Sequence, residues 1–294
     1  MMYKPSDYFS QHCVEELKQY ISKMLDKCGL YYRIFARSKS DESTLKKLQK
    51  KGYSHESGYL MQDFIGIRIA LYYYDDIEIC KEIIRKHFSV VDISVTTHDP
   101  ATFKPERLNI VCKIPDTTLN SINSNLWTSF PLDQTFEIQI RTIFSEGWHE
   151  IEHDIRYKSN TDWKAQSDLS RNLNGILATL ENCDWSIVAI TNDLSYREYK
   201  EKQWANMIKN KFRIRLKDDE LNDEIKKILD EDQNFAKSLY RADRKDFIIF
   251  LSEMSTTIPI NVNNIIYLFN HLHAHNELIN AITPAAFYKI LNYS

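Results

Sequence analysis

A basic segment near the N-terminus combines side chains that could bind a polyanion. Residues 31–52 hold seven Lys or Arg and two acidic residues, in a chain whose formal net charge is −3. Lys39, Ser43 and Lys47 follow one another at intervals of four, so Ser43 and Lys47 share one face of a predicted helix that begins beside Lys39. A helix N-terminus, a hydroxyl and two ammonium groups together can bind phosphate. The segment therefore predicts a polyphosphate site, and a solvated basic helix is the alternative.

The segment TFEIQIRT at residues 135–142 alternates polar and apolar residues, as a half-buried β-strand does. Successive side chains of a strand point to opposite faces, so Glu137, Gln139 and Arg141 share one face and the large apolar residues share the other. An acid, an amide and a guanidinium on one face are costly to bury and ordinary in water. This face is therefore either a solvent-facing surface or part of a polar site.

A second carboxylate, Asp63, directly precedes the apolar segment 64–73, which we expect to be an internal strand around Arg68. An isolated Asp before a strand is usually a turn residue. Two carboxylates from separate strands can, however, hold Mg²⁺, which takes oxygen ligands and commonly uses one or two carboxylates beside substrate phosphates. Asp63 and Glu137 are the candidates for such a pair.

A third motif offers competing chemistry, because residues 149–153 (HEIEH) match the HExxH pattern of zinc proteases. Both histidines would share one helix face. The two residues between Glu150 and His153 are normally uncharged in those enzymes, whereas one of them is Glu152 in this chain, and no GxxH follows to supply a third ligand. We therefore expect this segment to be something other than a zinc site.

Glycine is scarce, and its spacing excludes two families of phosphate-binding loop. The chain has six glycines, no two of them closer than six residues. The GxGxxG and GxxxxGK loops both need a different spacing of glycines. Any phosphate must therefore be bound by side chains rather than by a glycine-rich loop.

Composition indicates an ordinary globular protein without a membrane segment. The chain is 43% apolar and 27% charged, and its five cysteines include no CxxC pair, which argues against a disulfide framework and a cysteine zinc site. No apolar stretch approaches the ~18 residues that span a bilayer, and the first residues lack the pattern of a secretory signal. We therefore expect a cytoplasmic protein with no membrane partner.

Strands and helices are predicted to alternate in the first part of the chain. The patterns predict strands at 31–39, 64–73, 89–95, 107–114 and 135–142, and helices at 12–28, 43–51, 75–88, 143–158 and 168–200. This alternation indicates an α/β or α+β domain. Beyond residue 200 the chain is charged and helical in pattern, so we expect one domain at 1–200 and a helical region at 201–294.

Two ordered segments resemble the RelA/SpoT family of nucleotide pyrophosphokinases, the alarmone synthetases. The first resembles the family's R-x-K-x-x-x-S-x-x-x-K segment, which is met here by Arg37, Lys39, Ser43 and Lys47. The second, residues 62–76 (QDFIGIRIALYYYDD), resembles the family's D-x-x-G-I-R-I strand, with Asp63 at the magnesium position.

Further segments extend this resemblance in the same order. Residues 136–159 resemble the family's E-x-Q-I-R-T strand and the E-H-x-x-x-Y-K helix that follows it, with Glu137 at the second acidic position. This match accounts for the HExxH pattern, because Glu152 and His153 belong to that helix. Residues 173–184 resemble the helix that closes the family domain, so the resemblance covers roughly residues 10–195.

The resemblance implies an α+β fold, with a mixed sheet of about five strands flanked by helices as in nucleotidyltransferases, followed by an all-helical C-terminal region. It also implies transfer of the β,γ-pyrophosphate of ATP to a ribose 3′-hydroxyl, with release of AMP. Arg37, Lys39, Ser43, Lys47 and Arg68 would bind ATP and its phosphates. Asp63 and Glu137 would be catalytic and would hold Mg²⁺, with Glu137 sharing the metal or taking the proton of the attacking hydroxyl.

The acceptor side departs from the family pattern. Where the family usually has G-Y-R-S-L-H, with a Tyr that stacks on guanine, this chain has Lys104-Pro105-Glu106-Arg107-Leu108-Asn109. Pro105 replaces the stacking Tyr, and such an aromatic platform contributes roughly 1–3 kcal/mol per base. Arg107 and Asn109, with Gln139 and Arg141, remain the expected residues of the acceptor side.

The preferred acceptor is a guanine nucleotide, GDP or GTP, which would make the chain a synthetase of (p)ppGpp-type alarmones. Two alternatives stay open. The first is a toxin-type relative that modifies the 3′ end of tRNA or adenine nucleotides. The second is a nucleotide-sensing protein without turnover, although a sensor has no need of two metal carboxylates. The helical region at 201–294 would regulate the enzyme, bind a partner or form a homo-oligomer.

Overall fold

A computed structural model describes residues 3–95, 108–157, 163, 166–217, 220–254 and 258–292. The chain divides into two compact units. The first contains residues 1–22 and 32–184, and the second contains residues 23–31 and 185–294. The domain boundary that we expect at residue 200 lies inside the second unit.

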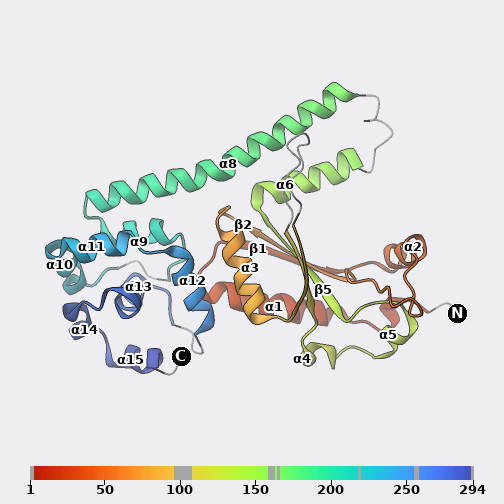
Figure 1. The fold of residues 1–294 in the computed structure, drawn as a ribbon, viewed down its shortest axis with the longest axis horizontal. Coiled ribbons are helices and arrows are strands. Elements are labelled where there is room, and N and C mark those ends of the chain that lie inside the picture. Colours follow the sequence, from red (N-terminus) through yellow and green to blue (C-terminus); the bar gives the residue numbers. More distant parts are fainter. Residues whose placement is uncertain are drawn as a thin grey trace. The chain divides into compact units, whose positions relative to one another are not determined.

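A five-stranded mixed sheet forms the centre of the first unit (Figure 1). Its strands, in chain order, are β1 (Tyr32–Ser38), β2 (Ile65–Leu71), β3 (Val90–Val95), β4 (Leu108–Lys113) and β5 (Thr135–Thr142). The order across the sheet is β1-β2-β5-β4-β3, in which β2 and β5 are parallel and the other pairs are antiparallel. The predicted mixed sheet of about five strands is therefore confirmed.

One face of this sheet is apolar and forms the core of the first unit. Ile67, Ile69, Ile138 and Ile140 alternate with polar residues along β2 and β5 and are at most 1% exposed. Helix α1 (Gln11–Lys27) contributes buried apolar residues from one stripe, and α3 (Asp76–His87) does the same. Phe88, at the end of α3, contacts the ring of Phe136 on this face at 5.3 Å. The polar residues of the central strands are thereby left to the opposite face.

Helix α2 (Asp41–Lys51) follows β1 almost at once. Ser40 caps its N-terminus by accepting a hydrogen bond from the amide of Ser43, and Gly52 ends it at a φ of +67°. The backbone amide of Lys39 donates to the carbonyl oxygen of Phe64 at 2.8 Å. This bond holds the start of α2 beside the entry to β2, and so brings two predicted site segments together.

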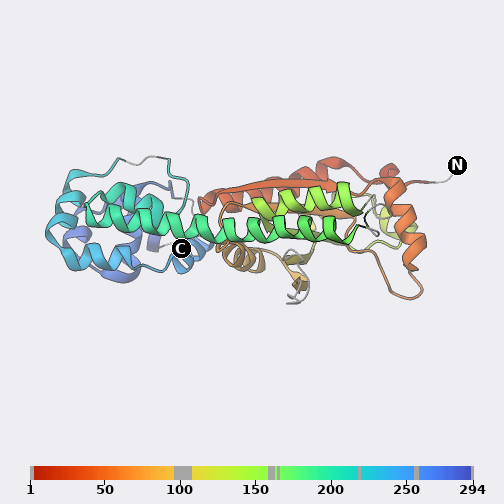
Figure 2. The ribbon, with the colours of Figure 1, turned by 90° about the horizontal axis from the view of Figure 1, so that it is seen from above.

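Helix α6 (Ile143–Ile151) begins where β5 ends, and a π-helical turn, η2 (Glu152–Tyr157), continues it. The helix that we predict at 143–158 is therefore α-helical as far as Ile151 and π-helical from Glu152 to Tyr157. Thr142 caps α6 by accepting from the amide of Ser145, and its hydroxyl donates to Asp184 Oδ2 at 2.8 Å. The first half of the long helix α8 (Ser167–Lys200) runs beside α6 (Figure 2). The short elements η1 (Pro5–Asp7), α4 (Asp116–Leu119) and α5 (Asn125–Ser129) complete the first unit.

The second unit is helical, as predicted for the C-terminal region. After α8 its elements are α9 (Trp204–Phe212), α10 (Asp223–Glu231), α11 (Gln233–Tyr240), α12 (Arg244–Glu253), α13 (Val262–Phe269), η3 (Asn270–Ala274), α14 (Glu277–Ile282) and α15 (Ala285–Asn292). Phe212 and Phe247 pack at 4.7 Å in its core. None of the helices in the described part of the chain is both long and apolar enough to cross a membrane.

Candidate active site

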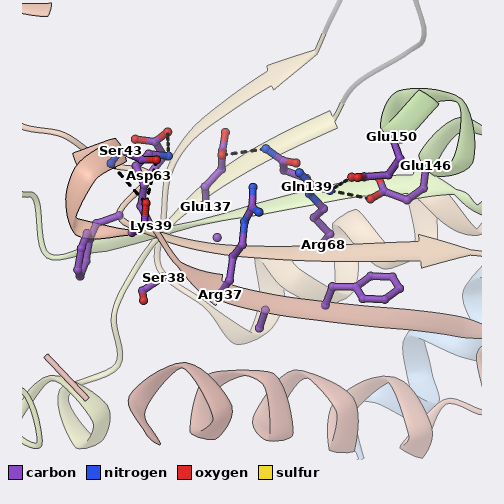
Figure 3. Close-up of a pocket in the computed structure, with 15 residues that line it drawn as sticks. Arg37, Ser38, Lys39, Ser43, Asp63, Arg68, Glu137, Gln139, Glu146 and Glu150 are labelled. Atoms are coloured by element: carbon purple, nitrogen blue, oxygen red, sulfur yellow. Dashed lines mark hydrogen bonds and ion pairs between the residues drawn. The ribbon is translucent and has the colours of Figure 1, made fainter. Parts of the chain in front are cut away.

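Polar residues from three strands meet on the sheet face opposite the apolar core. In the strand register Arg37 pairs with Gly66, and Gly66 pairs with Glu137, so these positions form one row across the sheet. Two residues along, Phe35, Arg68 and Gln139 form a second row. Since residues in register share a face, both rows project to the same side. Figure 3 shows Arg37, Arg68 and Glu137 rising from this side of the sheet.

A pocket of about 830 Å³ opens over these rows. A volume of this size is usual for a small-molecule site. Seven of the eleven residues predicted for the site line this pocket: Arg37, Lys39, Ser43, Asp63, Arg68, Glu137 and Gln139. Segments separated by about a hundred residues in the sequence are thus brought into a single cavity, with both predicted acidic residues in its wall.

Two lysines hold Asp63. Lys39 Nζ lies 3.1 Å from Asp63 Oδ2, and Lys47 Nζ lies 2.5 Å from the same oxygen. Partial burial alone would raise the pKa of Asp63, but the hydrogen bonds and charges of Lys47 and Lys39 outweigh it and leave the pKa below its usual value. Lys47 is outside the pocket wall and acts on the pocket through this carboxylate, which stays ionised.

A continuous chain of polar contacts links Glu137 to helix α6. Gln139 Nε2 donates to Glu137 Oε2 at 3.0 Å, and Arg141 Nη2 donates to Gln139 Oε1 at 3.1 Å. Arg141 Nη1 donates in turn to Glu146 Oε2 at 2.8 Å. Arg141 is 4% exposed and lies outside the pocket wall, so it supports Gln139 without facing the pocket. These contacts fix the orientation of the Glu137 carboxylate.

Arg68 is tied to the same helix. Its Nη1 donates to Glu146 Oε1 at 3.0 Å and also to Glu150 Oε1, and Figure 3 shows both contacts. Burial lowers the pKa of Arg68, but the neighbouring charges of Glu146 and Glu150 outweigh this and raise the pKa above its usual value. Glu146 therefore joins two arginines, and both glutamates line the pocket.

Sequence reasoning did not select Glu146 or Glu150 as site residues. Their spacing of four on the helix after β5 was the available signal, because it places both carboxylates on one helix face. The Glu150 of the HExxH pattern is one of these two carboxylates, and it pairs with Arg68. Within the described residues, no group of three or more His, Cys, Asp and Glu side chains is arranged to hold a metal ion.

The residues predicted for the acceptor side are only partly placed. Asn109 lies on β4 in register with Gln139, on the polar face, but outside the pocket wall. Its Oδ1 is buried, with no hydrogen-bond partner among the described residues. Arg107 and the preceding residues 104–106 lie outside the part of the chain that the structure describes.

The two acidic residues fit a magnesium ion. Asp63 Oδ1 is buried and has no hydrogen-bond partner among the described residues, while the lysines occupy only Oδ2. A buried, ionised carboxylate oxygen without a donor is a suitable cation ligand. Mg²⁺ commonly takes one or two protein carboxylates and completes its shell with water and phosphate oxygens, so the chemistry of Asp63 and Glu137, which line the same pocket, suits this ion.

Comparison with known proteins agrees with the motifs. The model of a region found in RelA and SpoT proteins matches residues 36–162, which is less than half of the chain. The chain is 32% identical over 129 residues to the GTP pyrophosphokinase YjbM of Bacillus subtilis, and 28% identical over 132 residues to YwaC of the same organism, also a GTP pyrophosphokinase. These matches cover 42% and 43% of this chain, and 56% and 59% of the relatives, so the chain spans little more than half of their length.

Among solved structures, the small alarmone synthetase 1 of Bacillus subtilis is similar to this fold. The two share 26% sequence identity at a TM-score of 0.50, and the match covers 63% of this chain and 93% of that one. The segments with Arg37, Asp63 and Glu137 all lie inside the matched region. Residues 36–162 of this chain therefore match the region found in RelA and SpoT proteins, which agrees with the resemblance of the ordered motifs.

Proposed function

We propose that this chain is an ATP-dependent pyrophosphokinase that transfers pyrophosphate from ATP to the 3′-hydroxyl of a guanine nucleotide. The observation that carries the proposal is the single pocket in which Asp63 and Glu137 lie beside Arg37, Lys39 and Ser43. The similarity to proteins named as GTP pyrophosphokinases supports it. Phosphoryl-type transfer is catalysed mainly by positioning and charge neutralisation, for which such a pocket has the necessary groups.

The phosphates of ATP are assigned to the α2 end of the pocket. Arg37, Lys39 and the N-terminus of α2 with Ser43 supply the positive charge and the donors there. Lys47 keeps Asp63 ionised and in place. Asp63 and Glu137 would hold Mg²⁺, which when bound neutralises charge on the phosphates.

Glu137 is assigned to the acceptor hydroxyl. Gln139 donates to its Oε2, which leaves Oε1 to take the proton as the 3′-oxygen attacks the β-phosphorus of ATP and AMP departs. Gln139 and Arg141 orient the carboxylate, and Asn109 lies in register with Gln139 on the same face. We assign Arg107 to the acceptor side on the sequence motif alone.

For the rest of the chain we propose a division of roles, with residues 1–200 catalytic and residues 201–294 non-catalytic. The helical region would regulate the enzyme, through a homo-oligomer or a bound partner. Light scattering of the full chain with and without nucleotides tests for an oligomer, and an unchanged monomer at every concentration would contradict that part of the proposal.

A transfer assay tests the main proposal. The purified chain is incubated with ATP labelled in the γ-phosphate, Mg²⁺ and one acceptor at a time: GDP, GTP, ATP or tRNA. Label in a guanine nucleotide supports the proposal. Label in tRNA or an adenine nucleotide identifies a toxin-type relative, and no transfer to any acceptor identifies a nucleotide sensor, so either result would overturn the guanine assignment.

A further inference from the structure

Three tyrosines gather in the second unit, where the end of α8 lies beside α9 and α11 (Figure 1). The rings of Tyr199 and Tyr240 stack at 4.8 Å, and the ring of Tyr196 lies 6.1 Å from that of Tyr240. Tyr196 is 47% exposed. Within the residues that the structure describes, none of the three hydroxyls is engaged in a hydrogen bond. The cluster therefore offers an exposed ring and several hydroxyl donors to a ligand.

A lysine lies over one of these rings. Lys211 Nζ of α9 is 5.7 Å from the centre of the Tyr240 ring, within the range of a cation–π contact. No hydrogen bond or ion pair joins Lys211 to another residue in the described part of the chain. Burial lowers the pKa of Lys211, the charges of Arg213 and Arg244 lower it further, and Asp243 opposes them. The surroundings of this ammonium group thus disfavour its charge.

The two arginines beside Lys211 are fixed in place. Arg213 Nη1 donates to Asn192 Oδ1 at 2.7 Å, and Arg244 Nε donates to the carbonyl oxygen of Phe212 at 2.5 Å. Their exposed fractions are 5% and 7%, so water screens their charges poorly. A bound anion would offset the repulsion between the three cations, and the phenol hydroxyls beside Lys211 would donate to the same anion.

We propose that this cluster is a second nucleotide site, in which Lys211 and the hydroxyl of Tyr240 bind the phosphates and the exposed ring of Tyr196 stacks on the base. The ligand class is a nucleoside triphosphate, because phosphate oxygens accept from ammonium and hydroxyl groups and every base has a flat face for an aromatic ring. The inference does not rest on the proposed transfer, since all of these residues belong to the second unit. It gives the helical region a means to sense nucleotides.

Calorimetry of the full chain with ATP and Mg²⁺ separates this site from the pocket of the first unit. The wild type should bind ATP at both sites, with a stoichiometry of about two. Gly66→Val, which narrows the pocket of the first unit, should retain the second site. Lys211→Gln should retain the pocket. Each of these variants should therefore bind with a stoichiometry of about one.

Inorganic tripolyphosphate separates the phosphates from the base, and Gly66→Val is the background for this test. Lys211→Gln added to it should weaken both ATP and tripolyphosphate about tenfold or more, because it removes the ammonium group. Tyr196→Ala added to it should weaken ATP about 5- to 150-fold, through loss of the stacked ring. Its affinity for tripolyphosphate, which has no base, should be unchanged.

Control variants and a stability measurement test for a merely structural role. Lys209→Gln removes a charge two residues earlier on α9, on another face of the helix, and should leave both affinities unchanged. Trp185→Ala removes another exposed ring of α8, 58% exposed, and should do the same. Without nucleotide, Lys211→Gln should unfold at the wild-type temperature or slightly above it, because it relieves the repulsion from the arginines. A lower unfolding temperature would show that Lys211 supports the fold, and would overturn the site.

The remaining outcomes distinguish this inference from the proposed function. If the wild type binds ATP at a single site that Gly66→Val abolishes, the second site is overturned and the pocket stands. If that single site is abolished by Lys211→Gln and kept by Gly66→Val, the second site stands and the proposed function loses its ATP pocket. If Lys211→Gln in the Gly66→Val background binds ATP as tightly as Gly66→Val alone, the second site is overturned.

Discussion

Gly66 on β2 is the register partner of Glu137 on β5, so the position next to the second acidic side chain has no side chain of its own. The polar row across the sheet therefore contains a gap between Arg37 and Glu137. The backbone of Gly66 does not require glycine, since its φ is not positive and a Cβ would be free of contacts within 4 Å. Gly66 lines the pocket, so its missing side chain adds to the open space there.

Filling this gap should block binding without unfolding the protein. Gly66→Val should reduce ATP affinity by at least about tenfold, which corresponds to ~1.4 kcal/mol. A β-branched residue suits a strand, so thermal stability should be unchanged or slightly higher. Calorimetry with ATP checks the predicted loss of affinity, and a thermal unfolding scan checks the predicted stability. Gly147→Ala in α6 is the matched control, since a Cβ there also meets nothing within 4 Å. Normal ATP binding by Gly66→Val would contradict the proposed position of the ligand.

Glu146 should matter more for stability than Glu150. Glu146→Gln removes the carboxylate that pairs with Arg141, which is 4% exposed, and should cost about 1–3 kcal/mol in the free energy of unfolding. Glu150 is 54% exposed and contacts Arg68 at the surface, so Glu150→Gln should cost less than about 1 kcal/mol. Urea unfolding of both variants makes the comparison. Equal losses of stability in the two variants would show that the contact of Glu146 with the buried Arg141 contributes no more than the exposed contact of Glu150.

The strands and most helices of the first unit were predictable because each has a clear periodicity. The alternation in TFEIQIRT placed Glu137 and Gln139 on the polar face, and the structure agrees, with Ile138 and Ile140 buried. The same pattern could not show that Arg141 is buried beside Glu146, because burial of a charge depends on a helix packed over the strand. The register that sets Gly66 beside Glu137 is likewise a property of strand pairing rather than of either sequence segment.

The buried carboxyl of Asp184 should make the first unit less stable as the pH rises. Burial raises the pKa of Asp184 from 3.8 to about 6; the hydrogen bond from Thr142 opposes this rise, and Glu181 adds to it. A group whose pKa is higher in the folded state stabilises that state at low pH, and this contribution is lost between about pH 4 and pH 6.

Asp184→Asn should remove this dependence, because the amide oxygen still accepts from Thr142 without a charge. The variant should be more stable than the wild type by about 1–3 kcal/mol at pH 8, and by much less at pH 5. Thermal unfolding of the wild type and the variant at the same two pH values checks this difference. Asp193→Asn, at an exposed position of α8, is the control. If Asp184→Asn gained the same stability at pH 5 and at pH 8, the raised pKa of Asp184 would not be the cause.

Gly29 should be needed for the second unit. Its φ is +68°, and a Cβ would lie 3.0 Å from Ile260 Cδ1 and 3.1 Å from Ile214 Cβ. Gly29→Ala should therefore cost about 1–3 kcal/mol, through backbone strain and crowding. Gly58→Ala is the matched control, since it has the same positive φ with open space around it. Equal destabilisation of both variants would show that the packing against Ile214 and Ile260 contributes nothing.

The proposed transfer depends most directly on the two carboxylates of the pocket, and conservative variants of both test this in the transfer assay. Asp63→Asn and Glu137→Gln should each lower the rate of label transfer from ATP by about a hundredfold or more, while circular dichroism shows the wild-type fold. Asp133→Asn, outside the pocket wall, should transfer at the wild-type rate. Wild-type turnover by either Asp63→Asn or Glu137→Gln would show that the pair of carboxylates does not catalyse the transfer.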